Sequence, residues 1–328
     1  MTGVQTCALP ILSIRLSFHW FKGNQKSNDL EKECISSVDF ISKAWDTLSL
    51  LESCRAKSTV DNYKTALRSF AQYAGENVAK DCIDRLMMEG YQKWLVAHGI
   101  SQNCLSCYMR SLRSLMYQVV PGIKDKGVFD TVFTGRARTE KRAINIEKIT
   151  MLRQMVFPQA SPLQFSCDIF LFSVYAMGMP FVDIAFLQKR NIHEDYIVYH
   201  RHKTGQRIRV KIAEPMRQII DKYVCNDSPF VFPILTISST MTDYESARSK
   251  YNRHLKEMGR MIGLRQSLTS YVARHSWASI AYHSNIDITV IATALGHTSP
   301  HTTLTYISEI DDSRIDSANE QILGKFCF

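Results

Sequence analysis

A chain of 328 residues is long enough for two compact domains, and its apolar fraction of 45% can supply buried cores. The formal net charge of +9 favours a polyanionic partner, because each phosphate that a basic side chain neutralises releases condensed counterions. Plain solubility would also account for such a charge. The longest apolar run, residues 169–182, contains Gly178 and Pro180 and is too short to cross a bilayer, so we expect a core helix there.

The first eleven residues, Met1–Ile11, fit no pattern downstream and resemble a translated sequencing adapter. We expect them to be a non-native artefact, in which case the native N-terminus is missing. Residues 12–34 form a segment of unknown structure.

Residues 35–122 are expected to form an N-terminal bundle of helices joined by short loops. The apolar positions that recur at helical spacing are Val38, Ile41, Trp45 and Leu48, then Tyr63, Leu67, Phe70 and Ala74, then Leu86, Trp94 and Leu95, and finally Leu105, Tyr108, Leu112, Leu115 and Val119. Ser58 and Ser101 are typical N-caps of the second and fourth helices, and Gly99 is placed to end the third.

The cysteines, nine in all, are scattered, which is typical of reduced thiols in a cytosol. Cys104 and Cys107 form one Cys-x-x-Cys within the fourth helical pattern, but no second pair or nearby histidine completes a zinc site. We therefore expect these thiols on a buried helix face, and we expect no metal or other cofactor.

Pro121 and Gly122 end the helical pattern, and residues 123–144 are expected to be a basic linker. Residues 145–328 are expected to form a second domain that mixes α and β structure. Helical patterns cover residues 146–155, 163–177, 215–223 and the stretch from about residue 242, where Tyr251, Leu255, Met258 and Ile262 form a stripe. Residues 196–210 read as a β-hairpin that turns at Thr204 and Gly205. The predicted fold is thus mainly α with a small β-hairpin or sheet.

Two short segments carry the functional signal. Residues 268–278 contain Arg274, His275 and Trp277, and residues 295–306 contain Leu-Gly-His297 with Tyr306 nine residues after the histidine. Together they resemble the signature of the tyrosine recombinase (phage integrase) family, in a style similar to the integrases and invertases of Bacteroides-type mobile elements. The resemblance covers the second domain, and the N-terminal bundle resembles the core-binding (SAM-like) domain of that family. It implies a C-terminal catalytic domain of mixed α+β structure.

The resemblance implies a site-specific DNA recombinase that cuts and rejoins DNA through a 3′-phosphotyrosyl intermediate. Breaking a phosphodiester without a metal requires a nucleophile, cations for the non-bridging oxygens and an acid for the departing 5′ oxygen. Tyr306 would be the nucleophile, and the planar guanidinium of Arg274 would grip the phosphate. His297 would donate a hydrogen bond to the phosphate, and Lys203 at the hairpin turn would protonate the leaving oxygen. The plainer alternatives are a half-buried aromatic, a surface ion pair, a structural histidine and a solvated lysine.

Further residues are expected to assist. Asp183, His275 and Trp277 would support the site. The expected DNA contacts are Arg110, Arg113, Arg136, Arg138, Arg142, Arg201, His202 and Arg207, although solvated surface is the commoner place for such charges.

The sequence departs from the family pattern at two positions. Tyr271 occupies the first position of the His-x-x-Arg box, and a phenol is a poor general base because its pKa is about 10. The first arginine of the family falls on Pro180 in the stretch Gly178-Met-Pro-Phe-Val-Asp183, and Met177 offers no charge either. Either Lys189 or Arg190 reaches the site, or catalysis is slow or lost.

An active recombinase would bind double-stranded DNA with inverted half-sites as a homodimer and form a homotetramer in the synapse, with host DNA-bending factors as further candidate partners. Its closing helix, residues 312–328, would dock on a neighbouring protomer or on its own domain. The alternative is a DNA-binding protein on the same fold with weakened or lost catalysis; a type IB topoisomerase is a third reading, which the integrase-like N-terminal bundle disfavours. The expected location is the bacterial cytoplasm, in association with the nucleoid. The target sequence, the choice among integration, excision and inversion, and the loss of an arm-binding domain stay open.

Overall fold

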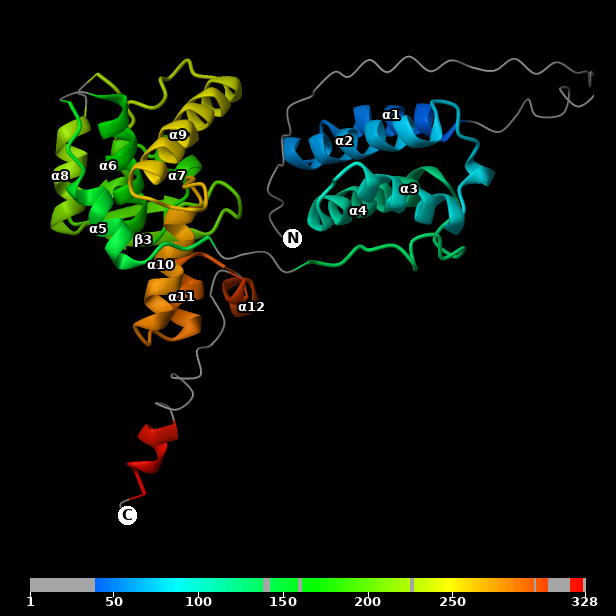
Figure 1. The fold of residues 1–328 in the computed structure, drawn as a ribbon. Coiled ribbons are helices and arrows are strands. Elements are labelled where there is room, and N and C mark those ends of the chain that lie inside the picture. Colours follow the sequence, from blue (N-terminus) through cyan, green and yellow to red (C-terminus); the bar gives the residue numbers. More distant parts are fainter. Residues whose placement is uncertain are drawn as a thin grey trace, which may run out of the picture. The chain divides into compact units, whose positions relative to one another are not determined.

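The computed structural model describes residues 39–137, 142–158, 161–224, 227–297, 299–305 and 319–326. Over these ranges the chain is mainly helical with one three-stranded antiparallel sheet, which confirms the predicted fold class (Figure 1). The chain divides into two compact units, residues 1–139 and 140–328. None of the helices in the described ranges is both long and apolar enough to cross a membrane.

Within residues 39–137 the N-terminal unit contains four helices and one short 3-10 turn. They are α1 (Phe40–Leu51), α2 (Lys57–Ala74), η1 (Lys80–Cys82), α3 (Arg85–Ala97) and α4 (Gln102–Val119). Ser101 caps α4 as expected, because its hydroxyl accepts the backbone N–H of Cys104. The expected cap of α2 is wrong: Ala56 precedes that helix, and Ser58 lies inside its first turn.

Aromatic side chains fill the core of this unit. Phe40, Phe70 and Tyr91 are fully buried, and Phe70 meets the other two rings edge to face at centroid distances of 6.1 and 5.3 Å. Burial of each such side chain stabilises the fold by roughly 1.5–3 kcal/mol. The expected core position Leu86 is wrong, since Leu86 is 73% exposed while Met88 of the same helix is buried.

The stretch expected to be a linker also contributes to this core. Ile123, Val128, Phe129 and Val132 are buried among the side chains of the four helices. A solvated linker would leave these apolar side chains in contact with water, whereas here they are buried. The stretch between the two units therefore begins later than residue 123.

The C-terminal unit contains the sheet, the helices α5 to α12 and a second 3-10 turn. In chain order these are α5 (Ile146–Gln154), α6 (Pro162–Tyr175), α7 (Phe181–Ala185), η2 (Lys189–Asn191), β1 (Ile192–His193), β2 (Tyr196–His200), β3 (Arg207–Lys211), α8 (Glu214–Tyr223), α9 (Met241–Met261), α10 (Val272–His283), α11 (Ile288–Ala294) and α12 (Pro300–Leu304). The predicted hairpin is confirmed, with Val198 of β2 opposite Arg209 of β3. The short strand β1, which pairs with β2, was not predicted.

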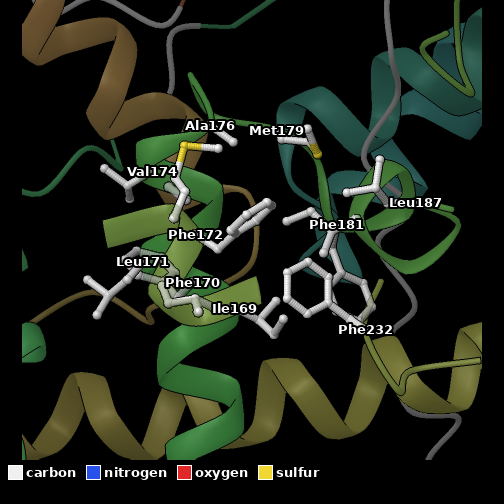
Figure 2. Packing of buried hydrophobic residues seen from close by; sticks show 14 of the residues in the cluster. Ile169, Phe170, Leu171, Phe172, Val174, Ala176, Met179, Phe181, Leu187 and Phe232 are labelled. Carbon is white, nitrogen blue, oxygen red and sulfur yellow. The ribbon is translucent and has the colours of Figure 1, made fainter. Parts of the chain in front are cut away.

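Helix α6 lies at the centre of the C-terminal core. Phe170 and Phe172 are fully buried, and the ring of Phe172 meets that of Phe232 at 4.8 Å, edge to face (Figure 2). The predicted stripe of α9 faces the same core, since Leu255 and Met258 are fully buried. The apolar run of residues 169–182 is not one helix, because the chain reverses after α6 at Met177 and Gly178, both of which have positive φ.

A smaller apolar cluster joins α10 to α11. Ala278 and Ala281 of α10 pack with Ile291 and Leu295, and Tyr271 and Trp277 lie partly buried against them. This packing places the turn that follows α11, residues 295–297, beside the first turns of α10.

Candidate active site

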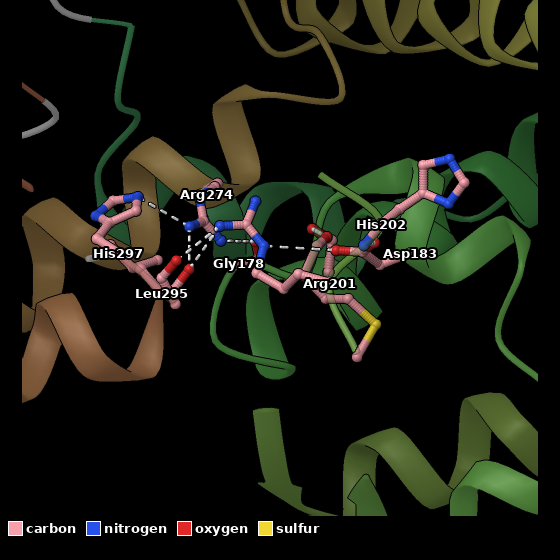
Figure 3. A network of polar contacts seen from close by, with 10 residues as sticks. Gly178, Asp183, Arg201, His202, Arg274, Leu295 and His297 are labelled. Carbon is pink, nitrogen blue, oxygen red and sulfur yellow. Dashed lines mark hydrogen bonds and ion pairs between the residues drawn. The ribbon is translucent and has the colours of Figure 1, made fainter. Parts of the chain in front are cut away.

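Arg274 occupies the centre of the site on the first turn of α10 and is only 3% exposed. Its Nη1 donates to the carbonyl oxygen of Gly178 at 3.2 Å, and its Nη2 donates to that of Leu295 (Figure 3). Gly178 permits this approach, because its φ is 70° and a Cβ there would lie 2.7 Å from the Cα of Arg274. Two backbone turns thus hold the guanidinium in one place.

Arg201 lies in the same site, just after β2, and is 8% exposed. Its Nη1 donates to the carbonyl oxygens of Leu295 and Gly296 at 3.0 and 3.2 Å (Figure 3). Both arginines therefore bind the carbonyl oxygen of Leu295, and their guanidinium groups converge on one turn. The sequence predicts Arg201 as a contact to DNA, and the structure places its side chain inside the fold beside Arg274 rather than on an exposed surface.

Gly296 explains how Arg201 fits. Its φ is 63°, and a Cβ at this position would lie 2.7 Å from Cδ of Arg201 and 2.9 Å from Cδ1 of Ile208. Glycine alone offers both the left-handed backbone and the free space. The Leu-Gly-His motif thus supplies carbonyl acceptors to two arginines, besides presenting its histidine.

His297 follows directly and is half-buried. Its Nε2 lies 3.0 Å from Nη2 of Arg274, which can only donate, so Nε2 accepts and the ring proton sits on Nδ1. Nδ1 then donates to the hydroxyl of Thr303, a buried residue of α12, at 2.9 Å. Burial, followed by the charges of Arg274, Arg201 and Lys203, lowers the pKa of His297 to about 3, which keeps this imidazole neutral.

Lys203 lies on the turn between β2 and β3, as predicted. Desolvation, and then the charges of Arg201 and Arg274, lower the pKa of its ammonium, so its proton is easier to give up than that of an ordinary lysine. The turn is tied to the site by Asp183 of α7, whose Oδ1 accepts the backbone N–H of His202 at 2.8 Å. The ring of His202 also stacks on that of Phe186 at 5.4 Å.

Asp183 is the carboxylate that faces these cations. Its Oδ2 lies 3.7 Å from Nε of Arg201, and both side chains are buried. Desolvation raises the pKa of this carboxyl, while the hydrogen bond from His202 and the charges of Arg201 and Arg274 oppose that change. The cluster formed by Arg201, Lys203, Arg274 and Asp183 has three basic side chains and one acidic one, so its surplus positive charge suits an anion.

The other predicted residues fall into three groups. Tyr271, the residue before α10, meets the ring of His275 edge on at 5.0 Å, and Trp277 packs against the apolar cluster of α10 and α11. Arg110 and Arg113 are half-buried on α4, while Arg136, Arg142, His202 and Arg207 are exposed. The predicted nucleophile Tyr306, the predicted contact Arg138 and most of the closing helix lie outside the described residues.

Several members of the site were not predicted from the sequence. Thr303 orients His297, and the carbonyl groups of Gly178, Leu295 and Gly296 hold the arginines. Among the described residues no group of three or more His, Cys, Asp or Glu side chains could hold a metal ion.

The comparisons with known proteins agree with one another. The sequence model of the phage integrase family matches residues 145–312, and that of the phage integrase SAM-like domain matches residues 38–120. The chain is 24% identical over 292 residues to tyrosine recombinase XerD of Bradyrhizobium diazoefficiens, which covers 78% of this chain and 87% of that protein. It is 31% identical over 120 residues to tyrosine recombinase XerA of Pyrococcus furiosus, which covers 35% and 40%.

Solved structures with a similar fold include a lambda integrase dimer bound to a COC′ core site, with a TM-score of 0.64, 14% identity and coverage of 84% of this chain and 80% of that one. The Tn1549 transposon integrase in complex with transposon right end DNA has a TM-score of 0.66 and 12% identity over 87% of this chain and 100% of that one. A lambda integrase tetramer bound to a Holliday junction has a TM-score of 0.63 and 14% identity over 84% and 80%. At such identities the likeness is one of fold.

Proposed function

Because this chain belongs to the phage integrase family and is a tyrosine-type site-specific recombinase, we propose that the cation cluster around Arg274 binds the scissile phosphate of DNA and that Tyr306 attacks it. The observation that carries this proposal is that Arg274 contacts both Leu295 and His297, while its charge also acts on Lys203, so that three residues far apart in sequence belong to one site. A surplus of positive charge held by rigid backbone groups is what a transition state with developing negative charge requires.

In the proposed reaction the hydroxyl oxygen of Tyr306 forms a bond to phosphorus and releases its proton to water, and the bond from phosphorus to the 5′ oxygen breaks. Lys203 gives its proton to the departing 5′ oxygen, a role that its lowered pKa favours. The product is a 3′-phosphotyrosyl ester and a free 5′ hydroxyl. Attack by a 5′ hydroxyl on this ester reverses the step and rejoins the strand.

His297 has to change state during this reaction. In the described structure its Nε2 accepts from Arg274 and has no proton to give. A phosphate placed between the two residues accepts the hydrogen bond that Arg274 now gives to His297. The negative charge of the phosphate favours the imidazolium form of His297, which can donate from Nε2. Thr303 holds the ring of His297 in place during the whole reaction by its hydrogen bond with Nδ1.

We further infer that the protein acts on double-stranded DNA with inverted half-sites, as a homodimer on one site and as a homotetramer when two sites are joined. The fold is shared with a lambda integrase dimer on a core site and a tetramer on a Holliday junction, which supports this inference. The exposed Arg136, Arg142, His202 and Arg207, together with the half-buried Arg110 and Arg113, are the proposed contacts to the DNA backbone, as is Arg138 outside the described residues.

The test requires a DNA site, which repeated selection of bound duplexes from a random library provides. A duplex with this site is then nicked a few nucleotides beyond the cleavage position, so that the short 5′-hydroxyl fragment diffuses away and any covalent complex accumulates. Wild-type protein should form a complex that resists denaturing detergent, and Tyr306→Phe should bind the duplex equally well and form none. Tyr282→Phe, a tyrosine of α10, is the matched control. Tight binding by the wild type without any covalent complex would favour the alternative, a DNA-binding protein with lost catalysis.

A further inference from the structure

We propose that Arg201 is the second guanidinium of the active site and binds a non-bridging oxygen of the scissile phosphate together with Arg274. This inference rests on the proposed function, and it assigns a catalytic role to a residue that the sequence pattern places among general DNA contacts. It also accounts for a site in which Pro180 supplies no charge.

The position of Arg201 supports this role. Its Nη1 shares the carbonyl oxygen of Leu295 with Arg274, so the two guanidinium groups lie around one acceptor atom. Its Nε is buried and has no hydrogen-bond partner among the described residues, because Oδ2 of Asp183 stays at 3.7 Å. Its Nη2 makes no hydrogen bond to any described residue, which leaves two nitrogen atoms, Nε and Nη2, to donate to a ligand.

The energetics point the same way. A buried arginine ordinarily requires a closely hydrogen-bonded carboxylate, because taking a cation out of water costs several kcal/mol. Among the described residues, the carboxylate that faces the buried Arg201 is that of Asp183, and this contact is too long for a hydrogen bond. An anion bound between the two guanidinium groups would compensate the remaining charge. A phosphodiester in the act of substitution offers two anionic oxygens, one for each arginine.

The two cations considered from the sequence are worse placed. Arg190 is exposed on η2, and neither its charge nor that of Lys189 is among those that act on His297 or Lys203. The charges that act on His297 are those of Arg274, Arg201 and Lys203. Those that act on Lys203 are Arg201 and Arg274. Arg201 therefore belongs to the same electrostatic unit as the expected catalytic groups.

The experiment compares wild type with Arg201→Lys on the nicked duplex, and measures the single-turnover rate of covalent complex formation separately from the dissociation constant for DNA. The matched control is Arg217→Lys, which changes a partly exposed arginine of α8 that pairs with Asp195. We expect Arg201→Lys to react about 100-fold more slowly, with a dissociation constant within about threefold of wild type. A second duplex has a methylphosphonate at the scissile position, which removes one negative oxygen. On that duplex the deficit of Arg201→Lys should shrink to less than about tenfold, because less charge is left to neutralise.

The outcomes separate the two proposals. If the wild type forms no covalent complex, the proposed function fails. If it does and Arg201→Lys reacts within about threefold of its rate, or shows the same deficit on both duplexes, Arg201 has only a structural role. Should Arg201→Lys not fold, a structure of Tyr306→Phe on the selected duplex decides. A nitrogen of Arg201 within hydrogen-bond distance of the scissile phosphate supports the inference, and Lys189 or Arg190 in that place overturns it.

Discussion

The contact between Gly296 and Arg201 predicts how a single methyl group should disable the site. In Gly296→Ala the alanine has to keep the φ of 63°, which costs about 1–2 kcal/mol for a residue with a side chain. The new Cβ also meets Cδ of Arg201 at 2.7 Å and Cδ1 of Ile208 at 2.9 Å, and such overpacking typically costs about 1–3 kcal/mol. The free energy of unfolding should therefore fall by about 2–5 kcal/mol, and Arg201 should be displaced.

Gly263 is the matched control for this change. Its φ is 69°, and a Cβ there would have no atom within 4 Å. Gly263→Ala should therefore lose only the conformational part, about 1–2 kcal/mol, and should form the covalent DNA complex at the wild-type rate. Urea unfolding followed by circular dichroism measures the stabilities, and the nicked duplex measures the rates. Equal losses of stability and rate in the two variants would refute the close packing of Arg201 against the Leu-Gly-His turn.

Three further predictions concern the titratable groups of the site. The pKa of His297 is about 3 in the folded chain and about 6.5 when unfolded, so its stabilising contribution is complete above pH 6.5 and is lost as the pH falls towards 3. In acid unfolding the wild type should therefore lose stability over this range more steeply than His297→Gln. Parallel stability curves for the two proteins would contradict this. Lys203→Ala should slow covalent complex formation by about 10²–10⁴-fold. A substrate with sulfur at the 5′ bridging position should restore the rate, because a thiolate leaves without an acid. If the sulfur substrate does not restore the rate, Lys203 is not the acid that protonates the leaving oxygen. Asp183→Ala should destabilise the fold by about 3 kcal/mol or more. Asp183→Asn should destabilise it by less, because the amide oxygen can still accept the N–H of His202. Equal unfolding midpoints for the two variants would argue against this.

Much of the architecture could be predicted because periodicity and capping act locally. The hairpin of β2 and β3, the stripe of α9 and the cap at Ser101 all follow from residue spacing. The exceptions depend on tertiary packing. Leu86 has the right residue type for the core, but its helix turns Met88 inward instead, and the buried apolar side chains of residues 123–132 join a core formed by all four helices of the unit.

The candidate site was predictable in its motif residues and less so in its geometry. Ile197, Tyr199 and Arg201 alternate along one face of the hairpin, and all three are buried. This period of two was a signal that Arg201 points inward, which reasoning from charge alone missed. The carbonyl of Leu295, which both arginines share, leaves no trace in the sequence, because every residue has one. The protonation of His297 likewise depends on Arg274 and Thr303.

The central claim is that Tyr306 becomes covalently linked to DNA through a phosphate held by the arginine cluster. The most direct measurement is to digest the detergent-resistant complex with trypsin and nuclease and to locate the remaining nucleotide by mass spectrometry. Cleavage after Arg274 and Arg314 gives a peptide of residues 275–314, in which the tyrosines are Tyr282 and Tyr306. We predict the nucleotide on Tyr306 through its 3′ phosphate. A nucleotide on Tyr282, on another residue or on no peptide would contradict the account.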